Sequence, residues 1–250
     1  MNRLCDAHTH FVTDEDLLLR EQLQIPSLMC FSTPKDMESF LNKQIRGSVI
    51  PTCGIHPWSA DRYQLKEFEK YFDTVPVIGE IGMDNVWCDV PLGIQEKVFE
   101  QQLELACSVH KPVILHTKGQ EKAIAGLIRK YPNRYLVHWY SCREYLDLYI
   151  EQDCFFSVGP DVCWNEATRR VAKNVPLDRI LTETDGLNAV EWAYNEAPAM
   201  LRSSMEIIPD TTEKALKTVL NSIAEIRQTD PALLSEKIYF NLKNRFLDQD

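Results

Sequence analysis

The amino-acid sequence predicts a (β/α)₈ TIM barrel, an α/β fold in which eight parallel strands alternate with helices. Three observations predict it. Short apolar runs alternate with amphipathic segments along the chain, and polar and ionisable residues gather where the apolar runs end. The length of 250 residues, with 9 glycines and no Gly/Ser-rich or Pro-rich linker, suits a barrel that folds as one unit. We therefore expect a single domain over residues 1–250.

The expected strands are short runs that are rich in apolar residues and flanked by turn or charged residues. This pattern is typical of strands buried on both faces of a parallel sheet. A doubly wound open sheet is the alternative, but no G-x-G-x-x-G motif follows the first run and the sequence contains no P-loop. The runs are Arg3–His8, Pro26–Phe31, Ser48–Gly54, Val75–Glu80, Pro112–His116, Tyr135–His138, Cys154–Val158 and Arg179–Thr184.

The segments between the strands are expected to form helices, because their apolar residues repeat at helical spacing. Thr33 followed by Pro34, and Asp230 followed by Pro231, are start signals in which a capping residue precedes a proline in the first turn. The expected helices are Pro34–Gln44, Leu92–Val109, Lys118–Lys130, Cys142–Gln152, Trp164–Asn174, Thr212–Thr229 and Pro231–Phe246.

The composition is that of a globular protein with an acidic surface, since 44% of residues are hydrophobic and the formal net charge is −10. Such a chain lacks the basic surface of a stable duplex-binding module. A phosphodiesterase is not excluded, because metal ions can supply local positive charge. The sequence has no membrane-spanning apolar run, no signal-peptide pattern and no C-x-x-C pair among its 8 cysteines. We expect a cytoplasmic protein with free thiols and predict no oligomeric state.

Residues with metal-ligand chemistry lie at the C-terminal ends of the expected strands, which converge on one rim of a barrel. A single His or carboxylate there is more often structural, but burying several together is costly unless they bind a cation. Nitrogen and oxygen ligands suit zinc, manganese or magnesium, and the number of histidines favours zinc. The set exceeds the roughly three protein ligands of one catalytic zinc, so we expect two divalent ions with Glu80 as a possible bridge. The candidates are His8, His10, Glu80, His116, His138 and Asp185.

Motifs around these residues occur in order along nearly the whole chain. They are Asp6-Ala7-His8-Thr9-His10, Gly54-Ile55-His56-Pro57, Gly79-Glu80-Ile81-Gly82-Met83-Asp84, Pro112-Val113-Ile114-Leu115-His116-Thr117, His138, Glu183-Thr184-Asp185 and Asn241-Leu242-Lys243-Asn244-Arg245-Phe246. In this order and spacing the chain resembles the TatD family of metal-dependent hydrolases, within the amidohydrolase-like barrel superfamily.

The resemblance implies a TIM barrel with two metal ions and deoxyribonuclease or other phosphoester hydrolase activity. It also implies a division of the ligands: one ion on His8, His10 and Asp185, the other on His116 and His138, and Glu80 between them. Two rim segments depart from the family pattern, namely Trp139-Tyr140-Ser141 after His138 and Gly186-Leu187-Asn188-Ala189-Val190-Glu191-Trp192 after Asp185. These departures leave the substrate open and metal binding expected.

The leading hypothesis is hydrolysis of a phosphodiester, with DNA as the first candidate, by a metal-activated water. Asp185 and Glu80 would be the catalytic carboxylates, with Asp185 as ligand and general base. His56 and Lys118 would contact a phosphate, although His56 could instead only brace the loop at Pro57 and Lys118 could be solvated.

Two alternatives stay open at this point. The same metals could hydrolyse an amide, a lactone or a deaminase-type substrate, or the chain could be a catalytically silent binding protein. The rim also carries aromatic residues that could stack on bases, although aromatic side chains in barrel loops more often only pack. These are Trp139, Tyr140, Trp164 and Trp192.

Overall fold

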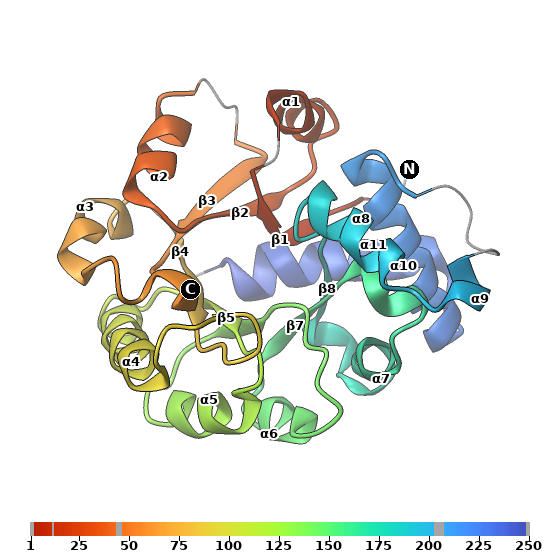
Figure 1. Ribbon diagram of the computed structural model, residues 1–250. Coiled ribbons are helices and arrows are strands. Elements are labelled where there is room, and N and C mark those ends of the chain that lie inside the picture. The colour runs from red at the N-terminus through yellow and green to blue at the C-terminus, as the bar shows by residue number, and fades with distance from the viewer. Residues whose placement is uncertain (1–2, 12, 44–46, 203–207, 249–250) are drawn as a thin grey trace.

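The strands of the computed structural model form one parallel sheet in sequential order from β1 to β8, and this sheet curves into a barrel (Figure 1). The structure describes residues 3–11, 13–43, 47–202 and 208–248. The fold is therefore the expected TIM barrel. The strands are β1 (Asp6–His10), β2 (Ser27–Phe31), β3 (Val49–Cys53), β4 (Val77–Gly82), β5 (Val113–His116), β6 (Tyr135–Val137), β7 (Phe155–Val158) and β8 (Ile180–Thr182).

The first strand lies further along the chain than the sequence predicts. The expected range is Arg3–His8, whereas β1 spans Asp6–His10, because Thr9 and His10 are still paired with β2 in the parallel ladder. The ionisable end of this segment therefore belongs to the strand itself. The other expected strands overlap β2 to β8 and differ from them only at their ends.

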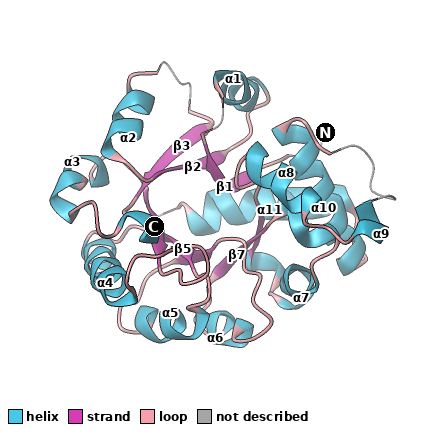
Figure 2. Cartoon of the chain, in the orientation of Figure 1, coloured by secondary structure: helices cyan, strands magenta, loops and turns pink. Residues whose placement is uncertain are grey.

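The helices surround the barrel (Figure 2). The expected helices overlap α2, α4, α5, α6, α7, α10 and α11, whereas α1, α3, α8 and α9 were not predicted. Gln44, the end of one expected helix, lies outside the described residues. The helices are α1 (Asp14–Gln22), α2 (Pro34–Leu41), α3 (Glu69–Phe72), α4 (Leu92–Ser108), α5 (Glu121–Ile128), α6 (Leu146–Ile150), α7 (Glu166–Asn174), α8 (Leu187–Asn195), α9 (Ala199–Arg202), α10 (Thr212–Arg227) and α11 (Pro231–Phe240).

The expected last helix, Pro231–Phe246, changes its hydrogen-bonding pattern before it ends. Its first part is α11, and Asn241–Phe246 continues as a π-helical turn. The side-chain amide of Asn241 donates to the carbonyl oxygens of Leu177 and Ile180, at 2.9 and 3.0 Å. This turn therefore attaches the end of the chain to the start of β8.

The seam between β1 and β8 is closed largely by side chains. Thr184 donates from its backbone nitrogen and its hydroxyl to the two carboxylate oxygens of Asp6, at 2.8 and 2.7 Å. The backbone nitrogen of Asp185 donates to the carbonyl oxygen of His8 at 3.1 Å. The seam thereby joins the strand that carries His8 to the segment that carries Asp185.

A buried arginine on α1 supports this seam. Arg20 is fully buried, and its guanidinium donates hydrogen bonds of 2.7–3.0 Å. A buried charge is costly unless it is paired and hydrogen-bonded, so this network fixes β1 relative to α1 and α10. The acceptors are Asp6, Thr9, Asp16, Ser27 and Thr212.

The hydrophobic core is one cluster that joins the barrel to its helices. It includes Leu28 and Phe156 on strands and Leu103 and Val219 on helices, all buried. Among the described helices, none combines the length and the apolar character that crossing a membrane requires. The C-terminal ends of the strands carry polar groups instead, and these form the candidate site.

Candidate metal centre

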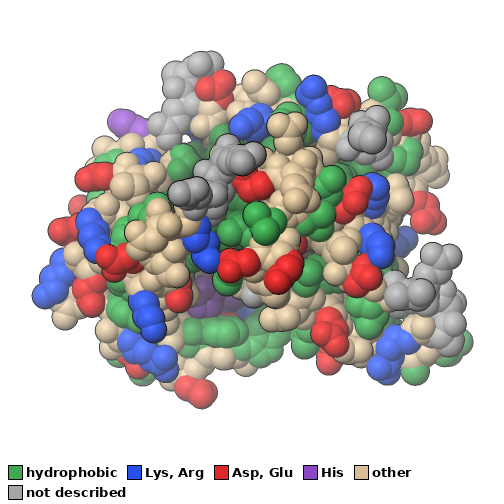
Figure 3. Space-filling model, turned by 90° about the horizontal axis from the view of Figure 1, so that it is seen from above, with side chains coloured by type: hydrophobic (Ala, Val, Ile, Leu, Met, Phe, Trp, Pro, Cys, Tyr) green, Lys and Arg blue, Asp and Glu red, His purple; other side chains and the backbone are tan. Residues whose placement is uncertain are grey.

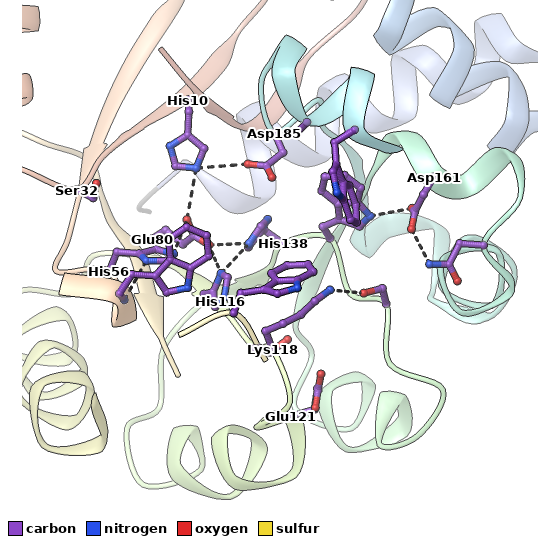
Figure 4. Close-up of a pocket in the computed structure, with 18 of the residues that line it drawn as sticks. His10, Ser32, His56, Glu80, His116, Lys118, Glu121, His138, Asp161 and Asp185 are labelled. Atoms are coloured by element: carbon purple, nitrogen blue, oxygen red, sulfur yellow. Dashed lines mark hydrogen bonds and ion pairs between the residues drawn. The ribbon is translucent and has the colours of Figure 1, made fainter. Parts of the chain in front are cut away.

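The six residues expected as metal ligands converge at the C-terminal rim of the barrel, as Figure 4 shows for five of them. His8 and His10 lie on the same side of β1, because side chains alternate along a strand. Glu80 lies within β4, His116 ends β5, His138 directly follows β6 and Asp185 lies in the loop between β8 and α8. The structure therefore brings these six residues together at one end of the barrel.

A close approach of β4 and β5 brings Glu80 to His116. A Cβ atom at Gly82 would lie 1.9 Å from the carbonyl oxygen of His116, which no side chain could tolerate. The φ angle of Gly82 is also +157°, at the edge of the region that favours glycine. Glycine at this position therefore allows the two strands to place their ligand residues together.

The carboxylate of Glu80 lies between two groups of imidazoles. Its Oε1 atom is 2.5 Å from Nδ1 of His116 and 2.7 Å from Nε2 of His138. Its Oε2 atom is 3.5 Å from Nε2 of His8 and 3.6 Å from Nε2 of both His10 and His56. One oxygen therefore faces His116 at the end of β5 and His138 just after β6, and the other faces the histidines of β1 and His56, which follows β3.

Asp185 adds a second carboxylate on the β1 side of the centre. Its Oδ1 atom is 3.3 Å from Nε2 of His8 and 3.4 Å from Nε2 of His10. The φ angle of Asp185 is +56°, a left-handed conformation that Asp adopts more readily than most residues, and Gly186 follows at +87°. This turn directs the Asp185 carboxylate back over the end of β1.

The donor set fits a metal ion. Both ring nitrogens of His8, Nδ1 of His138 and Oδ1 of Asp185 are buried without a hydrogen-bond partner among the described residues. Such atoms are costly to bury unless something binds them, and imidazole with carboxylate is a set that divalent transition metals accept. Three groups each place their ligand atoms within 4.8 Å of one another: His8, Glu80 and His138; His8, His10 and Asp185; and His56, Glu80 and His116. The cluster is therefore capable of binding metal.

The charges at the centre are strongly coupled. Burial by itself would raise the pKa of Glu80, but the surrounding imidazoles of His138, His56, His116 and His8 hold it well below its usual value. Burial also opposes protonation of His10, yet the carboxylates of Glu80 and Asp185 raise its pKa to about 9. In the metal-free protein the carboxylates thus hold protons on imidazoles that a metal would displace.

Asp84 supports His116 from the side opposite Glu80. Its Oδ2 atom is 3.0 Å from Nε2 of His116 and accepts a hydrogen bond of 2.7 Å from Nε1 of Trp58. Its Oδ1 atom accepts from the backbone nitrogens of Val86 and Trp87. Asp84 therefore orients His116 and orders the loop after β4, as expected of an anchor rather than a ligand.

Glu183 belongs to the Glu183-Thr184-Asp185 motif, but the sequence alone predicts no role for it. It is fully buried, and its Oε2 atom lies 3.6 Å from Nδ1 of His138 and accepts a hydrogen bond of 2.7 Å from the hydroxyl of Ser157. Burial raises its pKa although His138 lowers it. A buried carboxylate behind an imidazole orients the ring toward a metal.

His56 and Lys118, the two residues expected to contact a phosphate, have different surroundings. The Nδ1 atom of His56 accepts from the backbone nitrogen of Trp58 at 3.2 Å, so this residue braces its loop, while its other nitrogen faces Glu80. Lys118 donates to the hydroxyl of Ser141 at 2.8 Å and lies 4.4 Å from the ring centre of Trp87. Burial lowers the pKa of Lys118, while nearby carboxylates oppose this.

A cavity of about 700 Å³ opens over the centre and is lined by both of these residues and by five of the six expected ligands, His8 excepted. In the space-filling view a histidine side chain lies at the bottom of a recess bordered by hydrophobic side chains (Figure 3). Trp139, Trp164 and Trp192 line this cavity. Tyr140 does not, because its ring is buried against Tyr149 and Phe156.

Known proteins are similar to this chain in sequence or in fold. An uncharacterized metal-dependent hydrolase of Methanocaldococcus jannaschii is 27% identical over 204 residues, which cover 78% of this chain and 74% of that protein. A 3'-5' ssDNA/RNA exonuclease TatD of Edwardsiella piscicida is 25% identical over 178 residues, covering 66% of this chain and 68% of that one. The crystal structure of a TatD homologue from Escherichia coli is 21% identical, with a TM-score of 0.77 and coverage of 96% of both chains.

The comparison with protein families covers almost the whole chain. The family described as TatD related DNase matches residues 5–247, a range that includes every residue of the candidate metal centre. The expected resemblance is therefore confirmed, and the chain belongs to the family of TatD related DNases.

Proposed function

We propose that this protein is a metal-dependent phosphodiesterase of the nuclease type, with single-stranded DNA as the first candidate substrate. The observation that carries this proposal is the position of Glu80, whose two carboxylate oxygens each face a separate group of imidazoles. A carboxylate in this position can bridge two ions, as in two-metal phosphoryl-transfer sites. The family membership and the exonuclease name of one relative support the same reaction class.

The proposed ligands divide between the two sides of Glu80. His8, His10 and Asp185 would hold one divalent ion, and His116 and His138 would hold the other. His56 lies 3.6 Å from the Glu80 oxygen that faces β1, and its Nδ1 atom braces the loop by accepting from the backbone nitrogen of Trp58. We assign it to substrate contact and not to either ion. The predominance of imidazole favours zinc, with manganese or magnesium as further candidates.

When bound, the ions would lower the pKa of the attacking water and polarise the phosphoryl group. Asp185 would accept the proton of that water at Oδ2, since its Oδ1 atom faces His8 and His10. The water oxygen would form a bond to phosphorus as the ester P–O bond breaks, and the departing alkoxide would take up the proton that Asp185 received. Lys118, the one lysine or arginine among the described residues that line the cavity, would contact a phosphate oxygen.

The proposed partners follow from charge. With a formal net charge of −10 the chain offers no broad basic surface, so we propose transient binding of substrate at the cavity and no stable duplex binding. All 8 cysteines are free thiols in the described part of the chain, which supports the proposed cytoplasmic location.

The reaction class is tested with purified protein in Zn²⁺, Mn²⁺ or Mg²⁺ against single-stranded DNA, a generic phosphodiester and a lactone. We expect phosphodiester hydrolysis that a chelator abolishes. Activity confined to the lactone would refute the proposal and support the small-molecule alternative. The metal content of protein purified without chelator is measured as well. Active protein that contains no metal would contradict the metal-dependent mechanism.

Glu80→Ala tests the bridging role. We expect this variant to lose bound metal and activity together, because both groups of imidazoles would lose their shared carboxylate. The control is Glu236→Gln, whose side chain is 56% exposed on α11 and should leave both properties unchanged. Full activity of Glu80→Ala would exclude the bridge.

A further inference from the structure

The tryptophans of this chain are all gathered at one place. The sequence contains 5, and each of them lines the cavity over the candidate metal centre. They come from segments after β3, β4, β6, β7 and β8, so five separate rim segments contribute one indole each. They are Trp58, Trp87, Trp139, Trp164 and Trp192.

Trp139 is held rigidly. Its indole nitrogen donates to Oδ1 of Asp161 at 2.8 Å, and the other oxygen of Asp161 accepts from the amide of Asn165 at 2.6 Å. A Cβ atom at Gly159 would lie 2.7 Å from the Trp139 ring, so glycine there lets the indole lie against the backbone. Trp139 also directly follows His138, which fixes its distance from the metal centre.

Two further indoles extend from Trp139 in a continuous strip. The ring of Trp192 meets that of Trp139 edge-on at 6.0 Å and that of Trp87 edge-on at 5.9 Å. Trp87 and Trp192 keep 51% and 45% of their surface exposed. We call Trp87, Trp139 and Trp192 the tryptophan wall. Large aromatic surfaces left open beside a reactive centre are typical of a binding surface.

The charge around the wall argues against a long polyanion. Lys118 is the one lysine or arginine among the described residues that line the cavity, and it is already shared between Ser141 and Trp87. Proteins that follow a nucleic-acid backbone need several cations along its path. The cavity instead carries four carboxylates, on Glu80, Glu121, Asp161 and Asp185. Such a site favours one phosphate at the metals and an uncharged aromatic group beside it.

We propose that the tryptophan wall stacks on the base of the nucleotide next to the scissile phosphate, so that the preferred substrates are short single-stranded oligonucleotides. This inference rests on the proposed phosphodiesterase activity. Stacking is tolerant of sequence because every base has an aromatic face, and it contributes about 1–3 kcal/mol per base. Recognition by one base and one phosphate predicts little gain from a longer strand.

The test compares two substrates and three variants. The substrates are thymidylyl-thymidine and the same phosphodiester with base-free deoxyribose on both sides. We expect Trp192→Ala to lower kcat/KM for the dinucleotide about 10- to 100-fold and to leave the base-free substrate unchanged. Trp192→Phe keeps an aromatic face and should restore most of the loss. Phe240→Ala is the matched control, since Phe240 is 48% exposed on α11 and does not line the cavity.

Binding measured without turnover separates this inference from the proposed function. Thymidine monophosphate should quench tryptophan fluorescence in the wild-type protein and not in Trp192→Ala, and deoxyribose 5-phosphate should not quench it in either. If no phosphodiester is hydrolysed but this quenching pattern holds, the proposed phosphodiesterase activity is wrong and base stacking on the tryptophan wall is supported. If both proteins hydrolyse the dinucleotide equally and quenching is absent, base stacking is wrong and the phosphodiesterase activity is supported.

Strand length and salt provide a further measurement. A site that contacts one phosphate through Lys118 should show a salt dependence of log kcat/KM with a slope of about −0.7, the same for a dinucleotide and a 12-residue strand. A slope steeper than about −3 for the longer strand would show an extended backbone contact and overturn the proposed substrate class.

Discussion

The floor and the rim of the cavity are built in different ways. The floor consists of imidazoles and carboxylates at strand ends, and two of the imidazoles have a buried carboxylate behind them, Asp84 behind His116 and Glu183 behind His138. The rim consists of aromatic side chains on loops and on α8, and three of them, Trp58, Trp87 and Trp192, stay about half exposed. The difference teaches that the barrel fixes the chemistry, while the loops decide which substrate reaches it.

Substitutions in the floor of the cavity should cause the largest loss of activity. We expect Asp185→Asn to lower kcat by about 10²- to 10⁴-fold, because the amide cannot accept the proton of the attacking water. Quenching of tryptophan fluorescence by thymidine monophosphate should persist, since the tryptophan wall is unchanged. Kinetics at saturating metal measure the first effect. A loss smaller than tenfold would mean that another group is the base.

The frame beneath the floor should show a large effect on stability. Arg20→Met leaves Asp6 and Asp16 as buried carboxylates without their cation, so we expect the free energy of unfolding to fall by about 3–5 kcal/mol. Urea denaturation measures this value. Arg3→Met is the matched control, because its guanidinium is 61% exposed and its pair with Glu236 should contribute at most about 1 kcal/mol. Equal effects of the two substitutions would contradict a special role of Arg20 in the seam.

The extent of prediction from sequence follows the same division. The strand ends could be predicted because buried runs and the ionisable residues after them are visible in the sequence. The seam could not, because nothing in the pattern shows that Asp6 bonds to Thr184 across 178 positions or that Arg20 turns inward. Helix α8 was missed for a related reason, since the segment after Asp185 departs from the family pattern and carries a rim residue, Trp192.

Glu183 shows the limit within the site itself. Glu183 stands two positions before Asp185, where the alternation of an extended strand would direct both side chains to the same side. Only the structure shows that Asp185 adopts a φ angle of +56° and that Glu183 lies behind His138. A support of this kind is set by contacts between strands, which periodicity does not report.

Low pH should weaken metal binding at the floor of the cavity and leave base stacking on the tryptophan wall unaffected. The pKa of His10 is raised to about 9 in the metal-free protein, so below that pH a proton must leave before the ring can bind metal. For this proton alone, metal affinity should rise about tenfold per pH unit, or about 100-fold from pH 6 to pH 8. Competition with a chelator of known affinity measures it. An affinity independent of pH in this range would contradict the coupling of His10 to Glu80 and Asp185.

The carboxylate behind His138 should matter less than the ligands in front of it. We expect Glu183→Gln to weaken metal binding about 10- to 100-fold, because the neutral amide orients the imidazole less strongly. Elemental analysis and chelator competition measure the change. Glu196→Gln is a control on the exposed surface at the end of α8 and should bind metal as the wild type does. If Glu183→Gln binds metal with unchanged affinity, Glu183 has only a structural role.

The smallest expected effect lies where the floor meets the rim, at Lys118. Its ammonium is shared with Ser141 and Trp87, so only part of its charge is available to a phosphate. We therefore expect Lys118→Met to raise KM about fivefold, roughly 1 kcal/mol, and to leave kcat nearly unchanged. Ser141→Ala keeps the cation and removes only its hydrogen bond, so its KM should stay within about twofold of the wild type. A fall in kcat with KM unchanged would instead mean that Lys118 acts on the reacting groups and not in substrate binding. Lys118 would then belong to the catalytic floor of the cavity and not to its substrate-binding rim.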